Sequence, residues 1–538
     1  MEYQIFGTMK NHFSWKPLVV VEVAVILLMA LPSCNSGNIL VVPVDGSHWV
    51  NMKVLMEELH LKGHIMTVIR GSNTMYIAEK SPLYTSITIP IRTHLTEDFF
   101  PKFLKNVFEV QRGDKYLIKF LKFQKELLFM MSEIHCYSCQ MVSDILENTE
   151  LVKKLKEAQY DLVLTDPALA GGVVLAHYLK LPLVLNVRWI PSGEGHSALA
   201  PTPLSYIPSP GSGFSDRMSF TERVINILYC GITVFQQRFM IGPHYQALCD
   251  RYFESSCDIE TLIQSADIWL MRADFVFEFP RPTMPNVVYM GGFQCKPPKA
   301  LPEDLEEFVQ SSGEHGVILM SLGTVVDSLP SDICDEIAFV FATLPQKVIW
   351  RHLGNRPSML GNNTLLVNWM PQSDLLGHSK VKAFVAHGGT NGVQEAIYHG
   401  VPVLGIPLLF DQYDNLLRLK EKGAAKILDI ATLERGIFSS AILEILHNPS
   451  YRLNMQRLSR LHHDQPNKPL DSAIFWIEYV MRHKGAAHLR SESYKLPWYA
   501  YHSVDVIATL LAVPLLLLLT IIRAIRYFCH RVCKIKSK

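Results

Sequence analysis

The chain has 538 residues, of which 49% are hydrophobic, and this is enough for two domains that each bury a large core. Fifty-one lysines and arginines against fifty aspartates and glutamates leave a formal net charge of +1, which excludes a bulk electrostatic attraction to nucleic acid. The ten cysteines lack the spacing of a metal site, and Cys136-x-x-Cys139 is either a structural pair or two free thiols.

Residues 1–36 are typical of a secretory signal, and we expect them to be removed from the mature chain. Lys10 and Lys16 precede an apolar run over residues 18–31, and small residues follow it. Basic, apolar and cleavable segments in this order are those of a signal peptide. Glu22 lies inside the apolar run, so an uncleaved anchor is the alternative.

Residues 37–293 are predicted to form an N-terminal domain in which strands and helices alternate. A strand over residues 38–44 leads into the loop that carries His48, and a later strand ends at Asp166. Parallel strands end at one edge of a sheet, so Asp166 is expected within reach of the His48 imidazole. Structural roles are the alternative, because Ser47 and Asp166 are both good helix caps.

Two further stretches of this domain are each compatible with more than one role. Residues 97–146 are predicted to be helical and interleave bulky apolar residues with lysines. That pattern fits an acceptor pocket, a face resting on a membrane or ordinary helix core. Residues 189–217 are rich in proline, serine and glycine and are predicted to form a long loop, and such loops are often functional.

The prolines of residues 294–302 indicate a linker, after which residues 303–465 are predicted to form a C-terminal domain. A buried strand there ends at the turn Ser321-Leu-Gly-Thr324, whose amides and hydroxyls are suited to hold phosphate. Residues 466–500 are predicted to hold a further helix and a juxtamembrane segment.

The stretch from Trp369 to Gln412 carries the most informative pattern. An apolar strand runs into His387-Gly-Gly-Thr-Asn391, a helix with Glu395 follows, and a second apolar strand precedes Asp411-Gln412. A right-handed crossover makes the two strands parallel, so their carboxyl ends lie at the sheet edge where such folds bind ligands. The glycines allow close approach of the backbone, and the free N–H groups of a helix start favour phosphate. Taken singly, Gly-Gly fits a turn and Glu395 a solvated helix position.

The whole stretch resembles the signature of the UDP-glycosyltransferases, and most closely that of the animal UDP-glucuronosyltransferases. The resemblance implies an α/β fold of GT-B architecture, with two Rossmann-like domains facing a cleft. It also implies sugar transfer from a UDP-sugar to a hydroxyl, with UDP-glucuronate as co-substrate and no metal or other cofactor. The matching residues are Trp369, Pro371, Gln372, His387, Gly388, Gly389, Asn391, Gly392, Glu395, Pro402, Pro407, Asp411 and Gln412.

The same resemblance implies roles for individual side chains. His48 would be the base that takes the proton of the acceptor, and Asp166 would orient its imidazole in one inverting displacement. On the donor side, Trp369 would stack on uracil, Gln372 would contact the nucleoside and Glu395 would accept bonds from the ribose hydroxyls. The pyrophosphate would be held by His387, Gly389, Thr390, Gly392, Ser321 and Thr324, and the sugar would face Asn391, Asp411 and Gln412.

Residues 503–522 are apolar and long enough to cross a bilayer as a helix, and residues 523–538 form a basic tail. The positive-inside tendency places that tail in the cytosol and the catalytic domains in the lumen. Residues 534–538 resemble a dilysine retrieval signal, with an ordinary basic flank as the alternative. We therefore expect a single-pass type I protein of the endoplasmic reticulum membrane, and the triplet that begins at Asn362 suits a luminal glycoprotein.

The sugar and the acceptor are less well determined by the sequence. The signature is closest to the glucuronosyl branches, although Gln394 replaces a usual aromatic residue and no arginine is assigned to a glucuronate carboxylate. The resemblance implies a small lipophilic acceptor and a homo- or hetero-oligomer with related transferases. A glycolipid-type transferase that uses another UDP-hexose and a non-catalytic luminal partner subunit are the alternatives.

Overall fold

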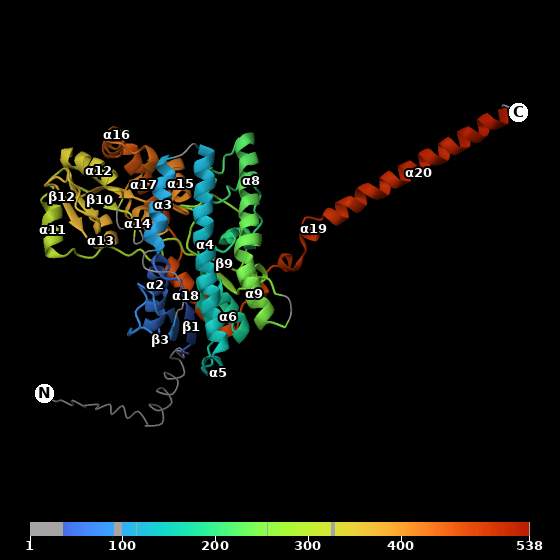
Figure 1. Ribbon diagram of the computed structural model, residues 1–538, viewed down its shortest axis with the longest axis horizontal. Coiled ribbons are helices and arrows are strands. Elements are labelled where there is room, and N and C mark those ends of the chain that lie inside the picture. The colour runs from blue at the N-terminus through green and yellow to red at the C-terminus, as the bar shows by residue number, and fades with distance from the viewer. Residues whose placement is uncertain are drawn as a thin grey trace, which may run out of the picture.

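The computed structural model describes residues 36–90, 99–113, 116–254, 257–323, 326 and 329–536. Two parallel β-sheets with helices around them form the body, and a long C-terminal helix projects from it (Figure 1). This is the α/β class that the sequence predicts. The signal-like residues 1–35 and the candidate phosphate ligand Thr324 lie outside the described residues.

The first sheet has seven parallel strands in the order β3-β2-β1-β4-β5-β8-β9. Strand β1 therefore lies beside β4, with Val42 opposite Thr165. This pairing brings the residues that follow the two strands to the same edge. The strands are β1 (Asn38–Val42), β2 (Ile65–Gly71), β3 (Thr85–Ile89), β4 (Leu162–Thr165), β5 (Leu183–Val187), β8 (Ile268–Met271) and β9 (Val287–Tyr289).

Both faces of this sheet are covered because its strands are buried on both sides. Leu40 and Val42 pack against α4, α5, α6, α9 and α10, whereas Ile39 and Val41 pack against α2 and α18. The helices are α2 (Ser47–Leu61), α3 (Phe99–Gly113), α4 (Tyr116–Glu147), α5 (Thr149–Glu157), α6 (Gly171–Leu179), α7 (Gly195–Leu199), α8 (Phe220–Gln236), the π-helix η1 (Gln237–Ile241), α9 (Gly242–Tyr252), α10 (Ile259–Gln264) and α18 (Pro469–His483).

The second sheet has six parallel strands in the order β12-β11-β10-β13-β14-β15. The strands are β10 (Val317–Ser321), β11 (Lys347–Arg351), β12 (Thr364–Val367), β13 (Val381–Ala386), β14 (Val403–Gly405) and β15 (Ala425–Ile427). The helices are α11 (Glu303–Gln310), α12 (Ser331–Thr343), α13 (Gln372–Leu376), α14 (Thr390–His399), α15 (Gln412–Glu421), the 3-10 helix η2 (Ile430–Thr432), α16 (Arg435–His447) and α17 (Pro449–His463).

Two predictions for the first half are refined by the structure. The helices expected over residues 97–146 are present as α3 and α4, and Phe103 and Val107 of α3 pack into the core of the second sheet. For α3, ordinary helix core is therefore the correct alternative. The loop expected over residues 189–217 is shorter than predicted, because the strands β6 (Trp189–Ile190) and β7 (Gly193–Glu194) and helix α7 occupy its first part.

The C-terminal part of the chain leads away from the body. After α18, three short helices precede α20 (Val504–Lys536): η3 (Ala487–Leu489), η4 (Glu492–Lys495) and α19 (Trp498–Tyr501). Within residues 504–532 of α20, which are exposed, an apolar stretch is long enough to cross a membrane. The helix is longer than the 503–522 expected because the basic tail continues it.

One disulfide joins Cys249 of α9 to Cys257, which lies just before α10. The sequence did not single out this pair. Cys136 and Cys139 are free thiols, so the second of the two alternatives for them is correct.

Buried ion pairs hold the two halves of the body together. The guanidinium of Arg418 in α15 lies between two carboxylates of the first half, 2.7 Å from Glu278 and 3.0 Å from Glu194. Arg188, directly after β5, also pairs with Glu278 and lies 3.7 Å from Asp411 of the second half. All of these side chains are buried or nearly so. Burial alone would raise the pKa of Glu194, but Arg418, Arg188 and Arg281 outweigh it and lower that pKa to about 2.

We expect Arg418→Ala to lower the free energy of unfolding by about 3–5 kcal/mol, because it leaves buried carboxylates uncompensated. A urea titration of the detergent-solubilised chain measures this. The control Arg482→Ala removes an exposed cation beside Glu478 on α18 and should cost less than about 1 kcal/mol. Equal losses for Arg418→Ala and Arg482→Ala would contradict the prediction.

The same ion pairs predict a pH dependence of stability. Since the pKa of Glu194 falls from 4.5 to about 2 on folding, its contribution to the free energy of unfolding should be full above pH 4.5 and lost as the pH approaches about 2.

Candidate functional site

His48 and Asp166 lie together at the carboxyl edge of the first sheet. His48 is in the first turn of α2, directly after β1, and Asp166 follows the neighbouring strand β4. The Nδ1 of His48 is 2.6 Å from Oδ2 of Asp166. The Asp166 side chain is only 1% exposed but the His48 ring is 26% exposed, so Asp166 holds an imidazole that remains accessible. The alternative role of Ser47 as a helix cap is wrong, because Gly46 is the cap residue of α2.

A third charged residue, Arg272, completes this group. It directly follows β8, and its Nη2 lies 3.3 Å from Oδ2 of Asp166 and 3.1 Å from Nδ1 of His48. Burial alone would raise the pKa of Asp166, but His48 and Arg272 outweigh it and hold that pKa below its usual value. Asp166 is therefore a carboxylate at neutral pH. Arg272 was not predicted from the sequence, although a charged residue directly after a buried strand at this edge was an available signal.

The edges of the two sheets meet beside this group. Asn51 lies one helical turn after His48 in α2, and its Nδ2 donates to Oδ1 of Asn391 in the first turn of α14 at 2.6 Å. Further along α14, the Nε2 of Gln394 donates to the backbone carbonyl of Arg272 at 3.0 Å. Gln394 is the residue that departs from the family signature, and here it joins α14 to the segment that carries Arg272.

Tight packing surrounds His387, which follows β13. A Cβ atom on Gly323 or Gly389 would lie 2.6 or 2.5 Å from the Nε2 of His387, so a larger residue at either position would displace this ring. Burial lowers the pKa of His387 to about 4, although Asp411 and the Ser321 backbone act in the opposite direction. The imidazole is therefore neutral at neutral pH, beside the start of α14 where backbone N–H groups are free.

Asp411 and Gln412 are positioned at the start of α15. The Oδ2 of Asp411 accepts hydrogen bonds from Thr390 Oγ1 at 2.9 Å and from Asn415 Nδ2 at 2.8 Å. The Oε1 of Gln412 accepts from the backbone N–H groups of residues 408 and 409 at 2.8 and 2.9 Å. These bonds fix the two side chains beside His387 and Thr390.

A second group of residues predicted to bind the UDP-sugar lies along α14, and it consists of Gln372, Gly392 and Glu395. The Nε2 of Gln372 donates to Oε2 of Glu395 at 2.7 Å, and Gly392 lies beside Gln372. Burial raises the pKa of Glu395 to about 7, while the bond from Gln372 acts to lower it and Asp374 to raise it. Trp369, just after β12, is 68% exposed and presents a free aromatic surface.

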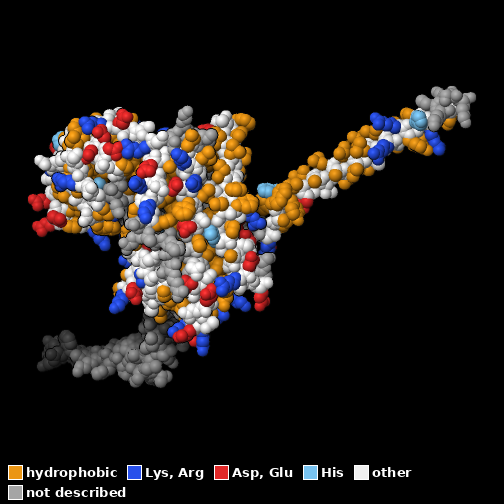
Figure 2. Space-filling model, viewed as in Figure 1, with side chains coloured by type: hydrophobic (Ala, Val, Ile, Leu, Met, Phe, Trp, Pro, Cys, Tyr) orange, Lys and Arg blue, Asp and Glu red, His pale blue; other side chains and the backbone are white. Residues whose placement is uncertain are grey.

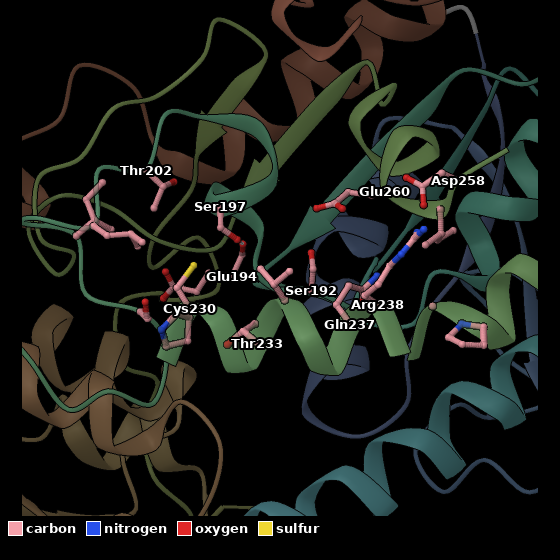
Figure 3. A pocket seen from close by; sticks show the side chains of 18 of the residues that line it. Ser192, Glu194, Ser197, Thr202, Cys230, Thr233, Gln237, Arg238, Asp258 and Glu260 are labelled. Carbon is pink, nitrogen blue, oxygen red and sulfur yellow. Dashed lines mark hydrogen bonds between the residues drawn. The ribbon is translucent and has the colours of Figure 1, made fainter. Parts of the chain in front are cut away.

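A cavity of about 820 Å³ lies elsewhere in the first half, between α8, η1, α9 and residues 192–210 (Figure 3). Thr233 and Gln237 line one wall, and Glu194 and Arg281 of the buried ion pairs also contact it. His48 and Asp166 do not line this cavity. Within the residues that the structure describes, no three or more histidine, cysteine, aspartate or glutamate side chains cluster as metal ligands would.

Known proteins resemble the chain over almost its whole length. The model of the family described as "UDP-glucoronosyl and UDP-glucosyl transferase" matches residues 37–538. UDP-glucuronosyltransferase 1A5 of Rattus norvegicus is 39% identical over 507 residues, which cover 94% of each chain. UDP-glucuronosyltransferase 2A2 of Homo sapiens is 39% identical over 530 residues, which cover 97% of this chain and 98% of the relative.

Solved structures share the fold at low sequence identity. The calicheamicin glycosyltransferase CalG4 has a TM-score of 0.58 at 17% identity and covers 83% of this chain and 99% of its own. The spinosyn forosaminyltransferase SpnP has a TM-score of 0.56 at 17% identity, with coverage of 83% and 100%. The two facing parallel sheets are thus the GT-B fold, as the sequence predicted. The chain belongs to the UDP-glucuronosyl and UDP-glucosyl transferase family, and it is a UDP-glycosyltransferase.

Proposed function

We propose that the enzyme transfers glucuronate from UDP-glucuronate to a hydroxyl of a small lipophilic acceptor in one inverting step. The observation that carries this proposal is the contact between Asn51 and Asn391, which brings the His48–Asp166 pair within one helical turn of α14. Glucuronate is favoured because relatives at about 40% identity are named UDP-glucuronosyltransferases. In this proposal the N-terminal domain, residues 37–293, takes the acceptor, and the C-terminal domain, residues 303–465, takes the donor.

The proposed chemistry at the acceptor depends on which ring nitrogen of His48 is hydrogen-bonded to Asp166. In the tautomer that carries the proton on Nδ1, His48 donates to the Asp166 carboxylate 2.6 Å away, and the lone pair of Nε2 accepts the proton of an alcohol. The alcohol oxygen bonds to the anomeric carbon as the bond from that carbon to the UDP oxygen breaks, and the attack from the opposite face inverts the centre. Asp166 stabilises the imidazolium that forms, in the manner of the orienting acid of a catalytic triad.

The donor roles are proposed for the residues grouped around α14. Trp369 offers its exposed ring to uracil, while Gln372 and Glu395 face the nucleoside and its ribose hydroxyls. His387, Ser321 and the amides around Gly389, Thr390 and Gly392 take the pyrophosphate, because neutral donors and a helix start stabilise the leaving group. Asn391, Asp411 and Gln412 face the sugar.

Localisation in the membrane of the endoplasmic reticulum, with the catalytic body in the lumen, is part of the same proposal. The apolar helix α20 suits a single membrane span, and the basic residues that follow it suit the cytosolic side.

A panel of labelled UDP-sugars with a phenol and with ceramide tests the reaction. We expect product from UDP-glucuronate and the phenol, and a loss of about 10²–10⁴-fold in kcat for His48→Ala, since that is the contribution of a general base. UDP binding should be retained by this variant. The control His60→Ala changes an exposed histidine of the same helix and should leave the rate unchanged. Product only from another UDP-hexose and ceramide would indicate a glycolipid transferase, and no product from any pair would indicate a partner subunit.

The pH dependence of donor binding tests the role of Glu395. Because burial raises its pKa to about 7, the carboxylate that accepts the ribose hydroxyls is only partly present at neutral pH in the empty enzyme. UDP-glucuronate should bind more tightly as the pH rises through about 7, with up to about tenfold weakening per unit below it. Calorimetry without acceptor measures this, and Glu395→Gln should bind weakly at every pH. A flat profile for the unmodified enzyme would remove Glu395 from ribose binding.

Glycosylation tests the luminal orientation. Asn362 is exposed in the turn before β12 and begins an Asn-x-Thr triplet, whereas Asn448-Pro-Ser450 is excluded as an acceptor by its proline. We expect one glycan on the chain expressed in cells, removable by endoglycosidase H and absent from Asn362→Gln. A chain without a glycan, together with protease access to the body in sealed microsomes, would contradict luminal placement.

A further inference from the structure

The helical segment formed by α8 and η1 exposes a continuous row of apolar side chains to solvent. The members of this row recur at helical spacing along one face, and there is no charged residue between Arg223 and Arg238. Figure 2 shows apolar side chains along the edge of the body that α8 forms, next to the start of α19 and α20. We call this row the outer face of α8, and it consists of Phe220, Val224, Ile227, Leu228, Val234, Phe235 and Phe239.

The opposite face of the helix fixes its orientation. Asn226 is buried, and its amide donates to the backbone carbonyls of Leu204 and Ile207 at 2.9 Å. Its Oδ1 accepts from the backbone N–H of Ser209 at 2.6 Å. Thr233 and Gln237, on the same side, line the cavity of Figure 3. The Asn226 amide is therefore satisfied by the protein on the inner side, and the apolar face is the one directed outward.

Helix α4 lies beside α8 and prevents the outer face from turning inward. The rings of Phe120 and Tyr229 are 5.9 Å apart, and Gln236 donates to Gln124 at 3.0 Å. A row of seven apolar side chains on one helix is more than the scattered apolar residues of an ordinary protein surface. Such a face indicates a binding surface.

We propose that the outer face of α8 lies on the surface of the bilayer that α20 crosses. A helix with one uncharged apolar face and a polar opposite face is suited to the boundary between headgroups and acyl chains. Arg223 lies over the ring of Phe220 at one end of the row, and it can extend toward lipid phosphates while its stem remains among apolar groups. Because α20 leaves the body on the side that α8 forms, the anchor holds the face close to lipid (Figure 1).

The same segment does not cross the membrane in this arrangement. Residues 220–252 contain a stretch that is apolar and long enough to span a membrane, but Asn226, Gln236 and Gln237 make the inner side of the helix polar. The bonds from Asn226 to residues 204–209 hold the helix against the body. The segment therefore lies on the bilayer and α20 alone spans it.

Photo-crosslinking of the full-length chain tests the proposal. The protein is placed in phosphatidylcholine vesicles with an alkyne-tagged acyl chain, with Phe235→p-benzoylphenylalanine on the outer face. Leu453→p-benzoylphenylalanine on α17 is the matched control, because Phe235 and Leu453 are 57% and 61% exposed. A third variant, Thr233→p-benzoylphenylalanine, places the probe on the inner side of the same helix. UDP binding verifies that each variant is folded.

We expect lipid adducts at position 235 several-fold above those at 453 and 233, identified on the tryptic peptide by the tag. Equal labelling at 235 and 453 would overturn the proposal, since any exposed side chain of an anchored protein would then contact lipid equally. Cross-links from 235 to a second copy of the chain in place of lipid would also overturn it. The result does not depend on which sugar or acceptor the enzyme uses.

Discussion

Buried charge at the junction of the two sheets is the constraint on which the site depends. Arg418 of the second half lies between Glu194 and Glu278 of the first, and Arg188 of the first half approaches Asp411 of the second. Each of these groups loses its hydration on burial, and only the correct alignment of both halves restores the lost interactions. A small rotation of one sheet against the other would leave several charges unpaired. The ion pairs thus define how the edge of the first sheet meets the edge of the second.

That alignment also sets the contacts around His48 at shorter range. The Asp166 carboxylate is shared by His48 and Arg272, and both hold the pKa of Asp166 below its usual value. Gln394 of α14 donates to the backbone carbonyl of Arg272, so α14 and the His48–Asp166 pair share one hydrogen-bonded path.

The sequence predicts the elements of the site better than their contacts. The rule that parallel strands end at one edge predicted that His48 and Asp166 could meet, and the signature grouped Gln372 with Glu395. Asn51, Arg272 and the ion pairs were missed because their partners lie far away in sequence and no local pattern marks them. The Cys249–Cys257 disulfide could not be deduced from ten cysteines. The hairpin at residues 189–194 was missed because Gly193, with φ of 119°, turns the chain where composition indicated a loop.

The two sheet edges that meet at Asn51 and Asn391 differ in charge, and this difference suits the proposed reaction. At the edge of the first sheet, the pKa of Asp166 is held below its usual value, so in the proposed reaction this carboxylate can stabilise a proton taken up by His48. At the edge of the second sheet, burial favours the neutral forms of both His387 and Glu395, whose pKa values move to about 4 and about 7. In the proposed reaction, the N–H groups at the start of α14 and the neutral His387 would be available for the negative charge that grows on the leaving group. Glu395 would become fully ionised in the same proposal when ribose hydroxyls bind its carboxylate, because their hydrogen bonds would replace those of the water lost on burial.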